Sequence, residues 1–333
     1  MANIFQKGEK LAATAVELLR REVRIPAIFS TKYGIADFRG AAGDVVNVKR
    51  PAMLRARDKG WRNDDAIVFD RLVQTKIQIA LNAHPYSAVQ LSPEEATLDI
   101  VNYVSEVQAP QVRALVEWFE DLYANALRSA TFINSVTFDP SSTDEKESDA
   151  RKVASRARRL FQEAHVPASG RYWLVGSAVA EAIRDTDKLL DVDTSGLPEA
   201  VRDGVVTRLS GFTVIEWAAL EPDESFFAHE SAIAVANVAP VVPNGVSKGG
   251  GVAAGNGLAL TQLWDYDSDH LKDRSIVHAF AGATPVLDPQ IGANGIVLDS
   301  NDEPTLQFVR AINVDFTEPV DDGDGDGGDG GGE

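Results

Sequence analysis

The chain has 333 residues, 44% of them hydrophobic, enough to bury a sizeable core in about two domains or in one elaborated domain. The formal net charge of −18 argues against a protein that grips nucleic acid over a broad patch, because neutralising phosphates needs clustered lysine and arginine. The absence of cysteine excludes disulfide bonds and thiolate metal sites.

The N-terminal residues predict a short amphipathic helix followed by an irregular arm. Leu11, Ala15 and Leu18 recur at helical spacing within residues 8–23, and Pro26 ends the pattern. Charged residues interrupt the apolar positions, so this start is not a signal peptide, and no apolar run approaches the roughly 18 residues of a membrane span. We therefore expect a chain that is cytoplasmic at synthesis, with an arm that needs another surface to lie on.

Two strands are predicted next, one ending at Pro51 and one covering residues 70–82, where apolar and polar residues alternate. The connector between them is rich in both signs of charge. One interpretation is a solvated loop, the default for such connections, and the sharper one is a projecting hairpin that contacts another chain. The candidate contact residues are Arg55, Arg57, Asp58, Lys59, Arg62, Asp64 and Asp65.

Two long helices are predicted after the connector. Ser92 and Glu95 form a capping box, and apolar residues at helical spacing then predict an amphipathic helix from residue 112 to about residue 130, with Pro110 in its first turn after a break. A second helix covers about residues 144–164, acidic at its start and basic later, which suits the helix dipole. We interpret its basic run, residues 151–159, as a solvated face rather than as a nucleic-acid site.

Beyond Pro167 the pattern becomes α/β. Strands are predicted at residues 171–177 and 211–217, a helix at 178–190, and a strand or short helix at 226–242, all in one compact layer. Residues 243–257 read as a flexible glycine-rich loop. Strands at 258–266 and 275–287 follow, and residues 296–316 predict a small terminal hairpin.

No catalytic constellation is visible. The histidines at 84, 165, 229, 270 and 278 each stand alone, without paired-ligand spacing. Asp265, Asp267 and Asp269 form a denser cluster that is able to hold a hard cation, although acids that solvate a turn are the favoured interpretation. We expect no catalytic, cofactor-binding or metal-ligating residues and no enzymatic activity.

The last thirteen residues, DDGDGDGGDGGGE, match a calcium-loop pattern through Asp322, Asp324, Asp326, Gly327 and Glu333. The pattern lacks flanking helices, and its many glycines raise the entropy cost of ordering it. We predict a disordered acidic tail over residues 321–333 rather than a calcium loop.

The order of these segments resembles the major capsid protein of tailed bacteriophages, most closely the coat proteins of phages that infect actinobacteria. The resemblance covers about residues 1–287 and rests on GDVVNVKRP, ARDKGWRND, the stretch from LSPEEATLDIVNYV to LVEWFEDLYANAL, RYWLVGSAVAEAI, LSGFTVIEW and FFAHESAIAVANVAP. It implies an α+β fold of the Hong Kong 97 type, with an N-arm, an E-loop, a peripheral domain built on a spine helix, and an axial domain.

The resemblance also implies domain bounds. These are an N-arm at 1–42, an E-loop hairpin at 43–90, a peripheral domain with the spine helix at 91–165, an axial domain at 166–257 and return strands to the peripheral domain at 258–287. Residues 288–320 form a C-terminal hairpin without a place in the family core.

By resemblance, the function is a structural one: self-assembly, through hexamers and pentamers, into the icosahedral shell around double-stranded phage DNA. The implied partners are scaffolding and portal proteins, and the shell encloses DNA without sequence-specific binding. The implied location is the virion capsid, which is assembled in the host cytoplasm without involvement of a membrane. The alternative is a calcium-binding or metal-dependent protein that uses the aspartate clusters. A DNA-mimicking acidic module is the weaker third interpretation, because the long helix and hydrophobic content favour a packed, assembling subunit.

Overall fold

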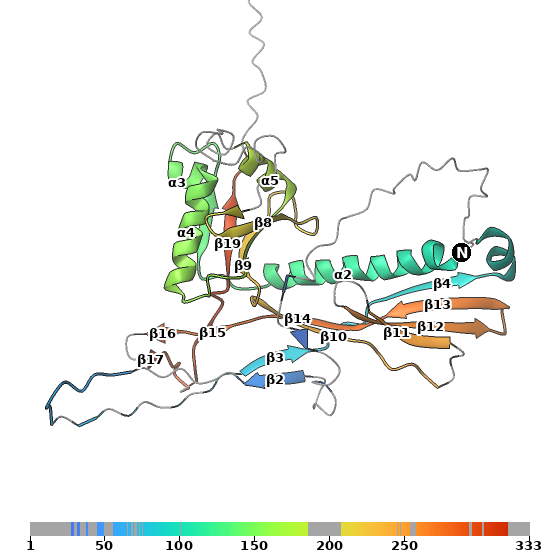
Figure 1. Cartoon of the computed structure of the whole chain (residues 1–333), viewed down its shortest axis with the longest axis horizontal. Coiled ribbons are helices and arrows are strands. Elements are labelled where there is room, and N and C mark those ends of the chain that lie inside the picture. The colour runs from blue at the N-terminus through green and yellow to red at the C-terminus, as the bar shows by residue number, and fades with distance from the viewer. Residues whose placement is uncertain are drawn as a thin grey trace, which may run out of the picture. The chain divides into compact units, whose positions relative to one another are not determined.

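The architecture comes from a computed structural model (Figure 1). The part of the chain that it describes comprises residues 28–29, 32–33, 38, 45–49, 56–64, 66–67, 69, 72, 74, 76–100, 102–185, 208–244, 246, 248–253, 258–292, 295–301 and 303–318. The predicted helix at 8–23 and the acidic tail at 321–333 lie outside these residues.

The chain divides into two compact units, and each is built from two stretches of sequence. Unit 1 combines Met1–Ile133 with His229–Arg310, and unit 2 combines Asn134–Ala228 with Ala311–Glu333. These boundaries differ from the predicted domains, which placed the second helix beside the spine helix and the stretch after residue 228 in the axial domain.

The longest helix among the described residues, α2 (Ala109–Arg128), belongs to unit 1 and confirms the predicted amphipathic spine. Its buried face includes Leu115, Phe119 and Tyr123 at the predicted positions. Two π-helical turns precede it, η3 (Glu95–Asp99) and η4 (Val104–Gln108). Because η4 runs directly into α2, the predicted break does not lie next to Pro110, and Ile100 and Asn102 are the described residues outside the helices.

The predicted capping box opens η3. The Ser92 N–H donates to Glu95 Oε2 at 2.9 Å, and the Glu95 N–H donates to Ser92 Oγ at 3.3 Å. Each side chain thus satisfies a backbone donor that the first turn leaves without an intrahelical partner.

Along α2 lies a four-stranded antiparallel sheet in the order β11-β12-β13-β4 (Figure 1). Its strands are β4 (Tyr86–Leu91), β11 (Lys248–Ala253), β12 (Ala259–Asp267) and β13 (Lys272–His278). The buried Gln111 ties the helix to the sheet: its Nε2 donates to the backbone oxygens of Ser87 and Ser275 at 3.2 Å and 3.0 Å, and its Oε1 accepts from Ser275 Oγ at 2.8 Å. A buried amide that is satisfied on both sides fixes the position of the helix along the strands.

A second set of strands in unit 1 carries the base of the predicted hairpin. β2 (Val45–Lys49) pairs antiparallel with β3 (Lys76–Ala80), which confirms two paired strands around the charged connector. A separate three-stranded sheet joins β1 (Lys32–Tyr33), β10 (Ile233–Val238) and β14 (Phe280–Pro285). Ile79 of β3 is fully buried against Ala234, Ala236 and Val286.

The end of β3 passes very close to β14. A Cβ added to Gly282 would lie 1.9 Å from the carbonyl oxygen of Ala80, so only glycine permits this approach. The base of the hairpin at β3 therefore packs closely against β14 of unit 1.

Unit 1 ends in two small ladders, β15 (Asp288–Pro289) with β18 (Leu306–Gln307) and β16 (Ile291–Gly292) with β17 (Gly295–Ile296). Arg310 closes this segment with two hydrogen bonds to the Asp288 carboxylate at 2.6 Å and 2.8 Å, and it also donates to Ser231 Oγ. The paired guanidinium and carboxylate fix both ends of the segment.

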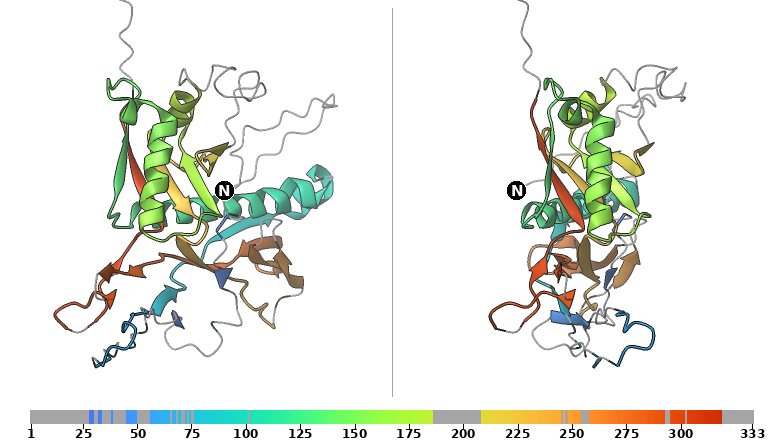
Figure 2. Two further views of the ribbon diagram at one scale, coloured as in Figure 1. Left: turned by 60° about the vertical axis from the view of Figure 1, so that its left-hand side comes forward. Right: turned by 90° about the vertical axis from the view of Figure 1, so that its left-hand side faces the viewer.

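Unit 2 is a six-stranded sheet in the order β5-β19-β9-β6-β8-β7, with helices packed against it (Figure 2). The strands are β5 (Ser135–Phe138), β6 (Arg171–Val175), β7 (Arg208–Leu209), β8 (Phe212–Glu216), β9 (Ser225–His229) and β19 (Ala311–Phe316). The helices are α3 (Glu145–Ser148), α4 (Ala150–Glu163) and α5 (Ser177–Arg184).

One buried cluster joins α4 and α5 to this sheet. Trp173 lies at its centre, stacked on Phe227 with ring centroids 4.6 Å apart and edge-on to Phe138. The predicted stripe of the second helix is confirmed at Val153, Ala157 and Phe161, all fully buried.

Four predicted elements are corrected. The second helix is split, because Asp149 has an extended backbone and caps α4, its Oδ1 accepting from the Arg151 N–H at 2.9 Å. The stretch 226–242 forms two strands, β9 and β10, in different sheets rather than one layer.

The loop at 243–257 contains β11, which pairs with β12 along its whole length. The C-terminal hairpin is wrong beyond Arg310, because β19 leaves it and enters the sheet of unit 2.

No described helix is both long enough and apolar enough to cross a membrane.

Candidate interaction surface

Two aspartates of the predicted cation cluster, Asp265 and Asp267, pair with basic side chains. Arg274 Nη2 lies 2.5 Å from Asp265 Oδ2, and His270 Nδ1 lies 3.1 Å from Asp267 Oδ2. Within the described residues there is no group of three or more histidine, aspartate or glutamate side chains that is able to hold a metal ion. Asp265 and Asp267 thus pair with Arg274 and His270 at a strand turn.

The histidines are not all separate. His84 Nε2 and His278 Nδ1 lie 2.9 Å apart, although 194 positions separate them in the sequence. Burial lowers the pKa of His278, and the nearby His84 lowers it further. The pairing follows from the antiparallel register of β13 with β4, which sequence spacing does not reveal.

The charged connector between β2 and β3 lies wholly in solvent where it is described. Residues 56–64 have neither helix nor strand, and every one is exposed. Of the seven predicted contact residues, five fall here: Arg57, Asp58, Lys59, Arg62 and Asp64. Arg55 and Asp65 lie outside the described residues.

A tight turn shapes this connector. Asp58 Oδ1 accepts from the Gly60 N–H at 2.8 Å, and both Gly60 and Arg62 have positive φ, at 79° and 59°. The aspartate-to-backbone bond and the left-handed backbone reverse the chain there. The turn therefore presents charged side chains of both signs together.

The same connector exposes large apolar side chains, which reasoning from charge missed. Trp61 is 91% exposed and Phe69 84% exposed, and Ile67 and Leu72 are also exposed. Four such side chains within one solvated loop cost free energy in water, and apolar surface of this kind marks an interaction site. The signal in the sequence was the stretch AIVF within an otherwise charged loop. We call Trp61, Ile67, Phe69 and Leu72 the apolar tip.

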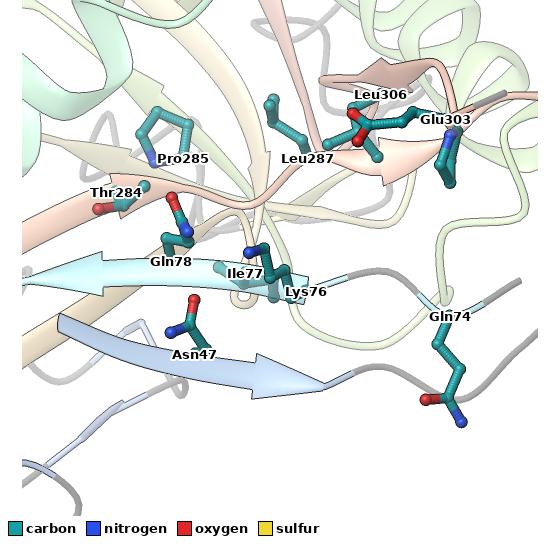
Figure 3. A pocket seen from close by; sticks show the side chains of 11 residues that line it. Asn47, Gln74, Lys76, Ile77, Gln78, Thr284, Pro285, Leu287, Glu303 and Leu306 are labelled. Atoms are coloured by element: carbon teal, nitrogen blue, oxygen red, sulfur yellow. The ribbon is translucent and has the colours of Figure 1, made fainter. Parts of the chain in front are cut away.

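A groove of about 680 Å³ lies beside the hairpin base, and all of its lining residues belong to unit 1 (Figure 3). Figure 3 shows side chains of β3 on one side and those of Thr284, Leu287 and Leu306 on the other. Leu287 and Leu306 are exposed large hydrophobic residues, at 39% and 43%. Lys76 and Glu303 add one charge of each sign to the lining.

No family model and no curated protein matches the chain. The similarity to known proteins is therefore seen only in solved structures. A chain from Mycobacterium phage Che8 aligns with a TM-score of 0.61 at 16% identity, covering 94% of this chain and 98% of that one. The mature capsid of bacteriophage PhiM1 aligns with a TM-score of 0.63 at 10% identity, covering 96% and 93%. The capsid of cyanophage P-SCSP1u aligns with a TM-score of 0.61 at 11% identity, covering 95% and 94%.

The chain has the Hong Kong 97-type capsid fold. The predicted α+β class and capsid fold are confirmed. Identities this low show the capsid fold and no more, so the likeness to phages of actinobacteria stays a prediction.

Proposed function

We propose that this protein is a phage major capsid subunit that assembles with copies of itself into an icosahedral shell. The observation that carries the proposal is the pairing of the capsid fold with an exposed apolar tip, on a connector with no core of its own. A subunit whose burial is completed by neighbours needs such a segment, whereas a monomeric protein would leave it in water at a cost.

The shell role extends to the domains. We assign the N-arm to residues 1–42, the E-loop to 43–90, the peripheral domain to 91–165 with return strands at 258–287, and the axial domain to 166–257. We add residues 311–316 to the axial domain, and the antiparallel pairing of β19 with β9, which lies within residues 166–257, supports this addition.

The charged residues of the E-loop suit recognition between subunits. Arg57, Asp58, Lys59, Arg62 and Asp64 are exposed and of mixed sign, and complementary charges steer association and register more than they add affinity. We assign these five, with Arg55 and Asp65, to contacts across the shell.

The net charge of −18 suits a container for DNA. An acidic wall encloses the polyanion without binding it tightly, because tight phosphate binding needs clustered cations. The proposal includes assembly in the host cytoplasm together with scaffolding and portal proteins. It also gives the protein a structural rather than a catalytic role in the virion.

Negative-stain electron microscopy tests the proposal directly. The intact chain is expressed alone and together with the proteins encoded beside it, and both samples are imaged. We expect closed shells or rings of five and six subunits in at least one sample. Dispersed monomers in both would contradict the proposal, and calcium binding by the intact chain in calorimetry would then favour the metal-binding alternative.

A further inference from the structure

We propose that the acidic tail, residues 321–333, binds a basic face of α4 in its own chain and covers this face against nucleic acid. The basic face consists of the cations of α4 that are exposed or half-buried: Arg151, Lys152, Arg156, Arg158 and Arg159. The inference goes beyond the proposed function, because a contact within one chain does not require a shell.

The basic face concentrates positive charge on an acidic protein. Its five cations stand within nine positions of a chain whose formal net charge is −18. They lie on the side of α4 that is turned away from the core, since Val153, Ala157 and Phe161 form the buried stripe of this helix (Figure 2). Like charges on one side of a helix repel one another, so an anion that binds there stabilises the helix.

Ion pairs within unit 2 leave this face basic. Lys152 pairs with Glu145, and Arg159 Nη1 lies 2.8 Å from Glu163 Oε1. Both pairs are exposed to water, where such pairs contribute little. Three cations of the face pair with no acidic side chain of the described residues, namely Arg151, Arg156 and Arg158.

Arg158 also lies near a second arginine. The buried Arg171 donates to the carbonyl oxygens of Val166 and Pro167, at 2.6 Å and 2.7 Å. Burial lowers the pKa of Arg171, and the positive charge of Arg158 lowers it further. An anion beside Arg158 would relieve this repulsion.

The described part of the chain ends close to the start of α4. The Thr317 N–H donates to the carbonyl oxygen of Phe138 at 3.1 Å. The next residue, Asp139, donates its N–H to the carbonyl oxygen of Glu147 at 3.0 Å, and α4 begins three positions later at Ala150. The tail therefore follows directly from a point beside the first turn of the basic helix.

The tail is long enough to cover the whole face. Residues 319–333 reach at most roughly 50 Å from Glu318 when fully extended. The 14 residues of α4 span only about 21 Å.

The charges of the tail complement those of the face. The tail has no cation, and its acids are Asp321, Asp322, Asp324, Asp326, Asp329 and Glu333. A segment tethered beside its binding site is present there at an effective concentration of about millimolar. A free polyanion lacks this advantage and approaches a chain of net charge −18, which repels it. These arguments favour the tail over nucleic acid as the occupant.

Binding of a short fluorescent duplex DNA, followed by anisotropy at low salt, tests whether the tail covers the face. The amide-tail variant replaces all six acids: Asp321→Asn, Asp322→Asn, Asp324→Asn, Asp326→Asn, Asp329→Asn and Glu333→Gln. It should bind the duplex at least about tenfold more tightly than the unmodified chain, because the cations of α4 become available to phosphates. Adding Arg156→Gln and Arg158→Gln to this variant should remove most of the gain.

A matched control separates the basic face from net charge. Arg184→Gln with Lys272→Gln removes the same charge outside α4, at a position on α5 and one on β13. In the amide-tail background this pair of changes should keep most of the gain in DNA binding.

Disulfide formation reports the contact directly. The chain contains no cysteine, so Gly327→Cys with Ser155→Cys places one thiol in the tail and one at an exposed position of the basic face, without changing any charge. Under mild oxidation of dilute protein, a disulfide within one chain should form rapidly at low salt and slowly at high salt, because salt screens the attraction.

Ala218→Cys with Gly327→Cys is the control for a tail that moves freely. β8 runs parallel to β6, the end of β6 lies at the start of β9, and β19 runs antiparallel to β9. β8 and β19 therefore end at the same edge of the sheet, and the exposed Ala218 lies just after β8. This position is within reach of the tail but outside the basic face, so its disulfide should form more slowly.

Three results would overturn the proposal. Equal rates at Ser155→Cys and Ala218→Cys would show a tail without a preferred site. Disulfides between chains rather than within one chain would assign the contact to neighbouring copies. Unchanged DNA binding by the amide-tail variant, or a gain that survives the loss of Arg156 and Arg158, would leave nucleic acid as the partner of the face or the face without a cover.

Discussion

The hydrogen bond between Trp173 and Ser225 shows how one side chain organises unit 2. Trp173 Nε1 donates to Ser225 Oγ at 2.7 Å, and this hydroxyl in turn lies 3.2 Å from the carbonyl oxygen of Leu174. Both side chains are buried. The indole thus supplies apolar area to the core and has its one polar atom satisfied, as a buried tryptophan requires.

Trp173→Phe should lower the free energy of unfolding of unit 2 by about 2 kcal/mol, through lost volume and a lost hydrogen bond. Ser225→Ala should cost about 1–3 kcal/mol, because it leaves the indole N–H buried without a partner. Urea unfolding of both single variants and of the double variant measures the coupling between them. Fully additive costs would show that the bond contributes nothing to stability.

The pair of His84 and His278 predicts a loss of stability in acid. His278 has a lowered pKa in the folded chain, so the unfolded chain takes up its proton first, below about pH 6.5. The stabilising contribution is therefore complete above that pH and is lost as the pH falls through the lowered pKa of His278.

Melting temperatures of the intact protein between about pH 7.5 and about pH 5.5 measure this effect. The melting temperature should fall in acid for the unmodified chain and fall less for His278→Gln. His270→Gln, at an exposed histidine outside this pair, is the comparison variant. Equal pH dependence in all three proteins would contradict the assignment.

At the scale of elements, Asp149 shows why one predicted helix became two. Its carboxylate competes with helical continuation by accepting a bond from the backbone two residues on, a known preference of aspartate. The following residues, Ala150 to Glu163, keep the apolar stripe and form α4. Periodicity predicted the stripe, but it did not reveal the interruption.

Asp149→Ala should destabilise unit 2 by about 1 kcal/mol or somewhat more through loss of the cap, while Asp149→Asn should keep most of it. Asp144 is the matched control, because its Oδ1 makes the same kind of bond, to the Lys146 N–H at 2.9 Å, on a helix that buries no residue. Asp144→Ala should thus cost less than Asp149→Ala in chemical denaturation. The reverse order would refute a capping role for Asp149.

At the scale of the whole molecule, the return of the chain as β19 is what completes unit 2. β19 pairs in parallel with β5 and antiparallel with β9, so residues 178 positions apart, such as Asn313 and Ser135, share a ladder. Ile312 and Val314 on this strand are buried in the core cluster. The sheet of unit 2 therefore depends on residues that follow unit 1 in the sequence.

Ile312→Asp should abolish cooperative unfolding of unit 2 or cost more than about 4 kcal/mol, since it buries an unpaired charge. Asp315→Asn lies on the same strand with its side chain exposed and should change stability by at most about 0.5 kcal/mol. Near-UV circular dichroism and thermal unfolding compare the two. A folded, cooperative Ile312→Asp protein would show that β19 is dispensable.

Elements held together by local interactions could be predicted from the residues alone. The spine helix, the capping box at Ser92 and the paired strands β2 and β3 follow from periodicity and from side-chain bonds that span a few residues. The charged connector was also visible in the sequence, although its apolar tip was overlooked beside the charges.

Contacts between distant segments depend on the fold and could not be predicted from the sequence. The glycine-rich stretch became β11 because β12 offers it a ladder, and β19 left the terminal hairpin because the sheet of unit 2 provides two partners. The meeting of His84 with His278 and the groove beside β3 arise in the same way. Such pairings depend on long-range backbone hydrogen bonds and shared burial, which leave no periodic trace in the residues themselves.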